Sequence, residues 1–391
     1  MDRRLILGSL QKPMVKLGFL HVLNDGFLAS LPLLLPFMQR DLGLGFESIG
    51  LLSSILACAG VVLALPSARL ARKFGGFCVL GMALLLYSVA FILAGCAVGL
   101  FSLTVSFALA SVGFGLFHPI AFALVAHGSS AQDVGTRMGH FTAIGDLGRI
   151  GIAATATFLV AALSWRETAI IYGVSSLLMF ALFFRHRPLS IKGEAPTGSK
   201  PHGLRCSENF ILAVIAGGLD ALASSSVFIF IPFLLVHRGI PTVLLGALSG
   251  AFFVGNMLGK VLVGKVVDKL GCFSVFVVSE IVMAVLLFYL SSQTSTVLIA
   301  LLSILLGAVT KGTVPVINTM VSNSVPDRAL YEKAFGIVSL VGGVAAVVAP
   351  YGYGLVAEHF GIVAVFHLCA CFALLAVIPG AWHRVVKRRQ R

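Results

Sequence analysis

Residues 77–95 read FCVLGMALLLYSVAFILAG, an apolar run without a single Asp, Glu, Lys or Arg. A helix needs roughly 20 such residues to cross the hydrocarbon core of a bilayer. The whole chain shares this character, because 58% of its 391 residues are hydrophobic and only 11% are charged. An average soluble protein has about 25% charged residues. The composition therefore excludes an ordinary soluble enzyme, whose polar surface this chain cannot supply.

Similar apolar runs before and after this one bring the predicted spanning helices to twelve. One connection is long: residues 185–208 are polar and rich in proline and glycine, which is typical of a linker. We therefore predict an all-α membrane protein with two six-helix halves, residues 1–184 and 209–391, the second ending in a basic tail. The predicted spans are 16–39, 47–68, 77–95, 101–126, 138–162, 168–184, 209–236, 242–264, 273–291, 296–322, 334–357 and 361–382.

The net charge of +13 has two possible explanations. A basic soluble protein binds nucleic acid, whereas a membrane protein gathers Lys and Arg in its cytoplasmic loops. Here most basic residues fall in the tails and in alternate loops, and the opposite loops hold only Arg40, Arg166 and Arg238. The distribution predicts a multi-pass protein of the bacterial inner membrane with both termini in the cytoplasm, and it argues against a nucleic-acid partner. The first apolar run is too long for a cleaved signal peptide.

Signatures of enzymes and metal sites are missing from the sequence. The seven cysteines form no C-x-x-C pair, and neither H-E-x-x-H nor G-x-x-x-x-G-K-[ST] occurs. We therefore expect no metal, no cofactor and no catalytic residues, with a proton gradient as the energy source. A channel and a membrane-embedded enzyme stay as remote alternatives.

The two halves align in a single register of 196 residues. Proline, glycine and lysine carry much of the alignment, so shared hydrophobicity does not account for it. Two parallel six-helix halves, with a substrate site where they face each other near the midplane, form a transporter architecture. The aligned residues include Leu35–Phe37 with Ile231–Phe233, Gly43 with Gly239, Gly50 with Gly246, Lys73 with Lys269, Gly75 with Gly271, and Pro119 with Pro315.

Residues 264–271, GKVVDKLG, resemble the G-x-x-x-D-[RK]-x-G signature of a cytoplasmic loop in the major facilitator superfamily. Glycine permits close helix approach, and the aspartate can cap a neighbouring helix. In the first half the counterpart is residues 68–75, ARLARKFG, where Arg replaces the expected Asp. A solvated basic turn is the alternative reading. The resemblance implies gating contacts by Gly264, Asp268, Lys269 and Gly271, and different contacts by Arg72 and Lys73.

Three further motifs resemble the fosmidomycin-resistance-like branch of this superfamily, which includes proton-driven drug exporters. They are HVLND at 21–25, FHP at 117–119 and F-x-x-x-G-x-x-G at 141–148. Two departures leave the direction of transport open. Ile120 stands where the branch usually has Glu, and the fifth span lacks the Gly-Pro pair common in antiporters.

Ionisable residues inside the spans mark the predicted transport site, since each costs at least about 2.5–3.5 kcal/mol to insert. We predict Asp25 as the proton-coupling carboxyl, because low dielectric favours its neutral form. His21, one turn earlier, would share that proton. Asp220 occupies nearly the same place in the second half and is predicted as a second coupling acid. For each acid, a role in helix packing is the alternative.

Arg149 is predicted to bind an anionic group of the substrate, because guanidinium makes bidentate contacts and stays charged. Asp146 lies three residues earlier, so a purely structural pair is the alternative. Lys311 would add a second positive contact or a switchable salt bridge to Asp220. His118 and Asn24 complete the predicted substrate site, with a core histidine as the other reading of His118.

Together these residues predict a monomeric, proton-coupled secondary transporter. It would move a small polar, anionic or zwitterionic, organic solute through the lipid bilayer by alternating access. Two alternatives remain open: a drug/proton antiporter that exports an antibiotic-like compound, and an importer of a metal-chelating metabolite. Glu280, in the ninth span, is predicted to be structural or paired.

Overall fold

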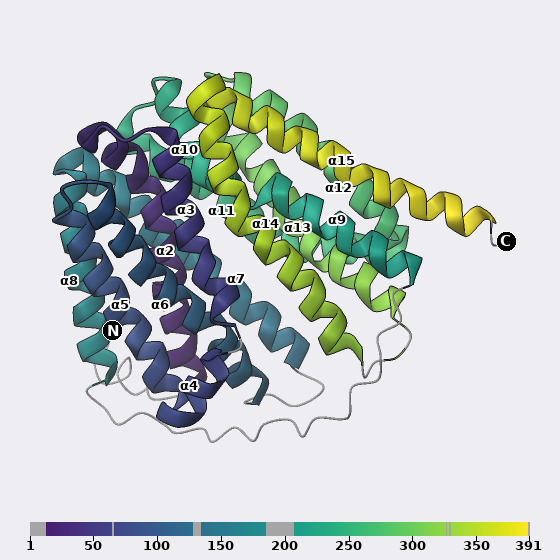
Figure 1. Ribbon diagram of the computed structural model, residues 1–391, viewed down its shortest axis with the longest axis horizontal. Helices are drawn as coiled ribbons and strands as arrows, with labels where there is room; N and C mark the ends of the chain where they lie inside the picture. Colours follow the sequence, from purple (N-terminus) through teal and green to yellow (C-terminus); the bar gives the residue numbers. More distant parts are fainter. Residues whose placement is uncertain are drawn as a thin grey trace. The chain divides into compact units, whose positions relative to one another are not determined.

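A computed structural model describes residues 13–64, 66–127, 134–184, 207–325, 327 and 330–389. Within these residues the regular structure is helical (Figure 1). The helices are α2 (Pro13–Leu42), α3 (Phe46–Val62), α4 (Pro66–Phe74), α5 (Gly76–Gly95), α6 (Leu100–His127), α7 (Val134–Ala162), α8 (Trp165–Phe184), α9 (Glu208–Ser224), α10 (Val227–His237), α11 (Thr242–Leu270), α12 (Cys272–Ser292), α13 (Thr296–Ser324), α14 (Tyr331–Phe360) and α15 (Ile362–Arg389).

The described helices supply 11 membrane spans, or 12 when the bent pair α3–α4 counts as one. Many apolar side chains on these spans are exposed, among them Leu85, Val89 and Leu93 on one stripe of α5. Such a stripe would be a liability in water and suits a lipid-facing surface. The predicted fold class, an all-α membrane protein of this size, is confirmed.

Two predicted spans are each divided into two helices. The predicted span 47–68 stops at Val62, and α4 begins at Pro66 with a bend of 66°. Proline has no N–H to donate, so it fits the first turn of a new helix. The predicted span 209–236 is interrupted at Ser225 and Ser226, between α9 and α10.

Contacts divide the chain into two compact units. Unit 1 comprises Met1–Leu44, Ile55–Ala195 and Thr242–Gly246; unit 2 comprises Gly45–Ser54, Pro196–Pro241 and Ala247–Arg391. The predicted linker falls almost entirely on residues 185–206, outside the described residues. The predicted boundaries of the two halves therefore stay predictions.

The same helix packing occurs in each unit. In unit 1, α2 packs on α7, and α5 packs on both α6 and α8. In unit 2, α9 packs on α14, and α12 packs on both α13 and α15. The aligned glycines also share backbone conformations, with φ of 62° at Gly43 and 73° at Gly239, and of 85° at Gly75 and 78° at Gly271. These features agree with the 196-residue repeat.

Candidate functional site

Glycines bring α7 of unit 1 unusually close to α2. A Cβ atom on Gly148 would lie 2.0 Å from the carbonyl oxygen of Val22. One on Gly145 would lie 2.6 Å from His21 Nε2 and 2.7 Å from Asp25 Oδ2. Small residues allow helix backbones in a membrane to approach in this way. The F-x-x-x-G-x-x-G pattern thus has a physical purpose: it opens the space that the polar side chains of α2 occupy.

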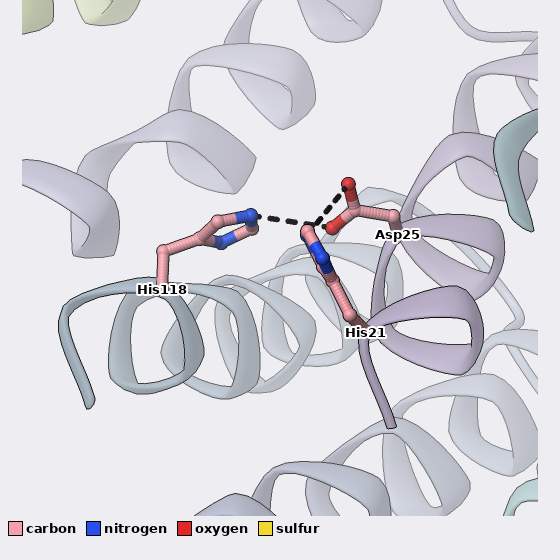
Figure 2. Close-up of side chains that lie close together, drawn as sticks. All are labelled: His21, Asp25 and His118. Atoms are coloured by element: carbon pink, nitrogen blue, oxygen red, sulfur yellow. Dashed lines mark ion pairs between the residues drawn. The ribbon is translucent and has the colours of Figure 1, made fainter. Parts of the chain in front are cut away.

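Asp25 is the centre of this space, and its carboxyl group is almost fully buried. Arg149 Nη2 of α7 lies 2.8 Å from Oδ2, and the Asn24 side chain donates a 3.0 Å hydrogen bond to Oδ1. His21 Nε2 and His118 Nε2 each lie 3.3 Å from a carboxyl oxygen (Figure 2). A buried carboxyl with these neighbours is stabilised in its ionised form. The expectation that burial alone would favour the neutral form of Asp25 is therefore wrong, because Arg149 compensates the buried charge.

Arg149 connects the two buried acids of the cluster. Its Nη1 donates to Asp146 Oδ1 at 3.4 Å, while Nη2 contacts Asp25. The Arg149 side chain is 20% exposed, whereas those of Asp25 and Asp146 are 3% and 1% exposed. The Arg149 side chain is therefore more accessible than the two carboxyl groups that it contacts.

His21 is fixed by the main chain of α7. Its Nδ1 lies 2.9 Å from the carbonyl oxygen of Phe141, which can only accept, so Nδ1 carries a hydrogen atom. Phe141 therefore fixes the orientation of the ring, with Nε2 turned to the Asp25 carboxyl group.

His118 approaches Asp25 from α6 inside a set of aromatic rings. Its ring centroid lies 4.7 Å from Phe114, 5.6 Å from Phe117 and 5.3 Å from His21. His118 Nδ1 is buried and has no hydrogen-bond partner among the described residues. The ring is partly exposed, at 22% of its side chain. His118 is thus held by aromatic contacts, with Nε2 turned to Asp25 (Figure 2).

The cluster also contains side chains of the types that bind transition-metal ions. One ligand atom each from His21, Asp25 and His118 lies within 4.8 Å of the others, and two imidazoles with a carboxylate suit such ions. However, Arg149 already contacts the Asp25 carboxylate at 2.8 Å. Its permanent positive charge opposes a second cation at the same carboxylate. The arrangement therefore favours an anion next to Arg149 over a metal ion next to Asp25.

A cavity of about 530 Å³ lies between α2 and α7, on the side of the cluster nearer the start of α2. Gly18 and Val22 line it from α2, and Phe141 lines it from α7. Its two basic lining residues are Arg137 and His140. The other lining residues are apolar or glycine.

The acids predicted in the second half lie in unit 2. Asp220 of α9 is buried, and its carboxyl group interacts with Thr313 of α13 and with Glu280 of α12. The charge of Lys311 also acts on Asp220, and the predicted salt bridge between the two side chains stays a prediction. The predicted meeting of Asp220 and Lys311 with the cluster of unit 1 in one central cavity stays a prediction.

The predicted gating residues are described in part. Arg72 and Lys73 lie exposed in the last turn of α4, and Lys269 lies exposed in the last turn of α11. Gly75 and Gly271 follow these turns, with positive φ angles that end the helices at low cost. The surroundings of Gly264 and the side chain of Asp268 fall outside the described part of the chain. The gating role of all six residues stays a prediction.

Sequence reasoning missed the aromatic part of the site. Phe114 and Phe117 flank His118, and Phe141 stacks on His21 with ring centroids 4.2 Å apart. The spacing of four residues between Phe114 and His118 would have indicated one of these contacts, since such residues share a helix face. The contacts to His21 come from other helices and leave no signal in local spacing.

Comparison with known proteins places the chain in a family. The sequence profile of the Major Facilitator Superfamily matches residues 17–246 and 213–391. A probable sulfoacetate transporter of Cupriavidus necator is 28% identical over 156 residues, which are 39% of this chain and 36% of that protein. The matched part thus spans about a third of the relative.

Solved structures share the fold over nearly the whole chain. A bacterial homologue of the human lysosomal transporter Spinster, inward-facing and unoccupied, has a TM-score of 0.73 at 12% identity, over 97% of this chain and 98% of its own. The nucleoside transporter NupG has a TM-score of 0.76 at 15% identity, over 94% of this chain and 98% of its own. At these identities the likeness concerns the fold alone.

Proposed function

Because the chain belongs to the Major Facilitator Superfamily and is thus a multi-pass membrane transporter of small molecules, not an enzyme, we propose that it moves small organic anions together with protons. The observation that carries the proposal is Arg149, a partly exposed side chain whose guanidinium contacts two buried carboxyl groups. The predicted setting is a monomer in the bacterial inner membrane with both termini in the cytoplasm. The distribution of Lys and Arg supports that orientation.

The substrate class follows from the chemistry of Arg149. Guanidinium offers parallel N–H donors that match the paired oxygens of a carboxylate or sulfonate. The partial match to a probable sulfoacetate transporter, whose substrate carries both anionic groups, supports the same class.

Proton coupling follows from competition for Arg149. Nη2 of Arg149 contacts Asp25 Oδ2, which also faces His21 Nε2. A proton transferred to Asp25 neutralises the carboxylate and weakens its attraction for Arg149. Nη2 then becomes available to the substrate, while Asp146 continues to hold Nη1. Proton and anion therefore bind together, and a proton gradient drives accumulation of the anion by alternating access.

His21, His118 and Asn24 keep the carboxyl group of Asp25 in place during this exchange. Asn24 donates to Oδ1, and His118 lies beside the same oxygen. His21 relays the proton, because Phe141 holds its other ring nitrogen. In unit 2, Asp220 serves as a second proton site and Lys311 as a second positive charge. No cofactor is part of this mechanism.

The proposal is tested by calorimetry on the purified protein with sulfoacetate as the probe. Titrations in two buffers of different ionisation enthalpy count the protons taken up with the ligand. We expect saturable binding with uptake of one proton, and no binding of uridine, a neutral nucleoside. Binding of uridine without sulfoacetate binding would refute the anion site, and sulfoacetate binding without proton uptake would refute the coupling.

A further inference from the structure

Unit 2 contains a second pair of acidic residues in an environment unlike that of Asp25. Asp220 lies in α9 at 6% exposure, and Glu280 lies in α12 at 0% exposure. The sequence predicted Glu280 to be structural or paired. Its partner is Asp220, because the two side chains interact directly with each other. Two separate helices thus bring two carboxyl groups together away from water.

The hydrogen bonding of this pair is incomplete. Both carboxyl oxygens of Glu280 and Oδ1 of Asp220 are buried without a hydrogen-bond partner among the described residues. Two ionised carboxylates in contact repel each other, and the low dielectric of a membrane protein strengthens that repulsion. One proton between them removes one charge and supplies the missing O–H donor. Unpartnered oxygens of this kind are therefore expected where two carboxyl groups share a bound proton.

Burial and hydrogen bonding indicate which acid carries the proton. Glu280 is 0% exposed with both carboxyl oxygens unpartnered among the described residues, whereas Asp220 is 6% exposed and lacks a partner at Oδ1. Because burial disfavours a charged carboxyl group, the geometry favours the proton on Glu280. Helices α14 and α15 also pack on α9. Tyr353 of α14 donates to the carbonyl of Leu222 of α9, and Cys369 of α15 contacts Tyr353. Both are neutral at pH 7.

We propose that Asp220 and Glu280 form a proton-binding site in unit 2, in which Glu280 holds the proton. The proton can pass from the Glu280 carboxyl to Asp220 Oδ1, so that one O–H bond breaks as another forms. In this step Glu280 donates its proton to Asp220. Its part in transport rests on the proposed proton coupling, but the bound proton itself does not.

Infrared spectroscopy of the purified full-length protein at pH 7 tests the site without any substrate. A protonated, buried carboxyl gives a C=O stretching band that shifts in D₂O, and an ionised one does not. We expect this band in the wild-type protein and its loss in Glu280→Gln. Asp220→Asn should keep the band at a shifted frequency, since Glu280 stays protonated beside a neutral amide. Glu167→Gln, at an exposed glutamate, is the matched control and should change nothing.

Absence of the band from the wild-type protein, or its persistence in Glu280→Gln, would overturn the proposal. If Glu280→Gln does not fold, the difference spectrum between wild type and Asp220→Asn decides, because the frequency shift arises only from a carboxyl next to residue 220. Failure of sulfoacetate binding would leave these spectra unchanged. The proposed function and the proton site can therefore fail separately.

Discussion

The buried acids of the two units differ in what surrounds them. Asp25 in unit 1 contacts a guanidinium, two imidazoles and an amide. Glu280 in unit 2 faces another acid and has no hydrogen-bond partner among the described residues. The 196-residue register aligns Asp220 with Asn24, whereas it aligns Arg149 with Ala345 and His118 with Val314. The two units share much of their helix packing but differ in their buried charges, in keeping with the proposed anion site in unit 1 and the proposed proton site in unit 2.

The largest expected effect on stability comes from removing the positive charge of Arg149 in unit 1. Arg149→Gln leaves Asp25 and Asp146 without their shared cation, and breaking a buried ion pair costs about 3–5 kcal/mol. Because the Arg149 side chain is 20% exposed, we expect a loss near the lower end. Thermal unfolding in detergent measures it. The double variant Arg149→Gln/Asp25→Asn should recover much of the stability, and a double variant as unstable as the single one would contradict the account.

The next effect concerns the close approach of α2 and α7. Gly145→Ala places a Cβ atom 2.6–2.7 Å from His21 Nε2 and Asp25 Oδ2, and overpacking costs about 1–3 kcal/mol. We expect lower thermal stability and loss of sulfoacetate uptake into proteoliposomes. Gly151→Ala on the same helix is the control, because a Cβ there meets nothing within 4 Å. Equal behaviour of the two variants would refute the role of Gly145.

A smaller effect is expected from Arg149→Lys. The lysine keeps the charge but loses the paired donors of guanidinium. We expect sulfoacetate affinity about tenfold weaker, equivalent to about 1.4 kcal/mol, with little change in stability. Calorimetry measures the affinity directly. Unchanged affinity would exclude bidentate recognition at this residue.

The smallest effect should come from unit 2. If Glu280 is protonated as proposed, Glu280→Gln replaces a neutral acid with a neutral amide, so we expect the unfolding free energy to change by less than about 1 kcal/mol. A loss of several kcal/mol would indicate that Glu280 is ionised and paired in the native protein. Compared with Arg149→Gln, this variant shows whether the two units hold their acids in opposite protonation states.

Much of the fold could be predicted from local patterns. The run at 77–95 corresponds to α5 at Gly76–Gly95, because the length of an apolar segment is a property of the sequence itself. The breaks after Val62 and Ser224 were missed, although Pro66 and the serines at 224–226 lie at those points. Hydropathy alone does not reveal these breaks, because a broken helix can be as apolar as a continuous one.

The site could be predicted only where one helix contains both partners. The spacing of three residues from Asp146 to Arg149 predicted their contact, which is present at 3.4 Å. The 2.8 Å contact between Arg149 and Asp25 was not predicted. It depends on how α7 is rotated against α2, which the sequence does not specify locally. For the same reason, Glu280 was not recognised as the partner of Asp220.

The central claim is that a proton on Asp25 releases Arg149 for the anionic substrate. Sulfoacetate flux in proteoliposomes with Asp25→Asn tests it most directly, because the amide mimics the permanently protonated acid. The account predicts that accumulation driven by a pH gradient disappears while exchange of internal for external sulfoacetate continues. Accumulation at the wild-type level in this variant would contradict it.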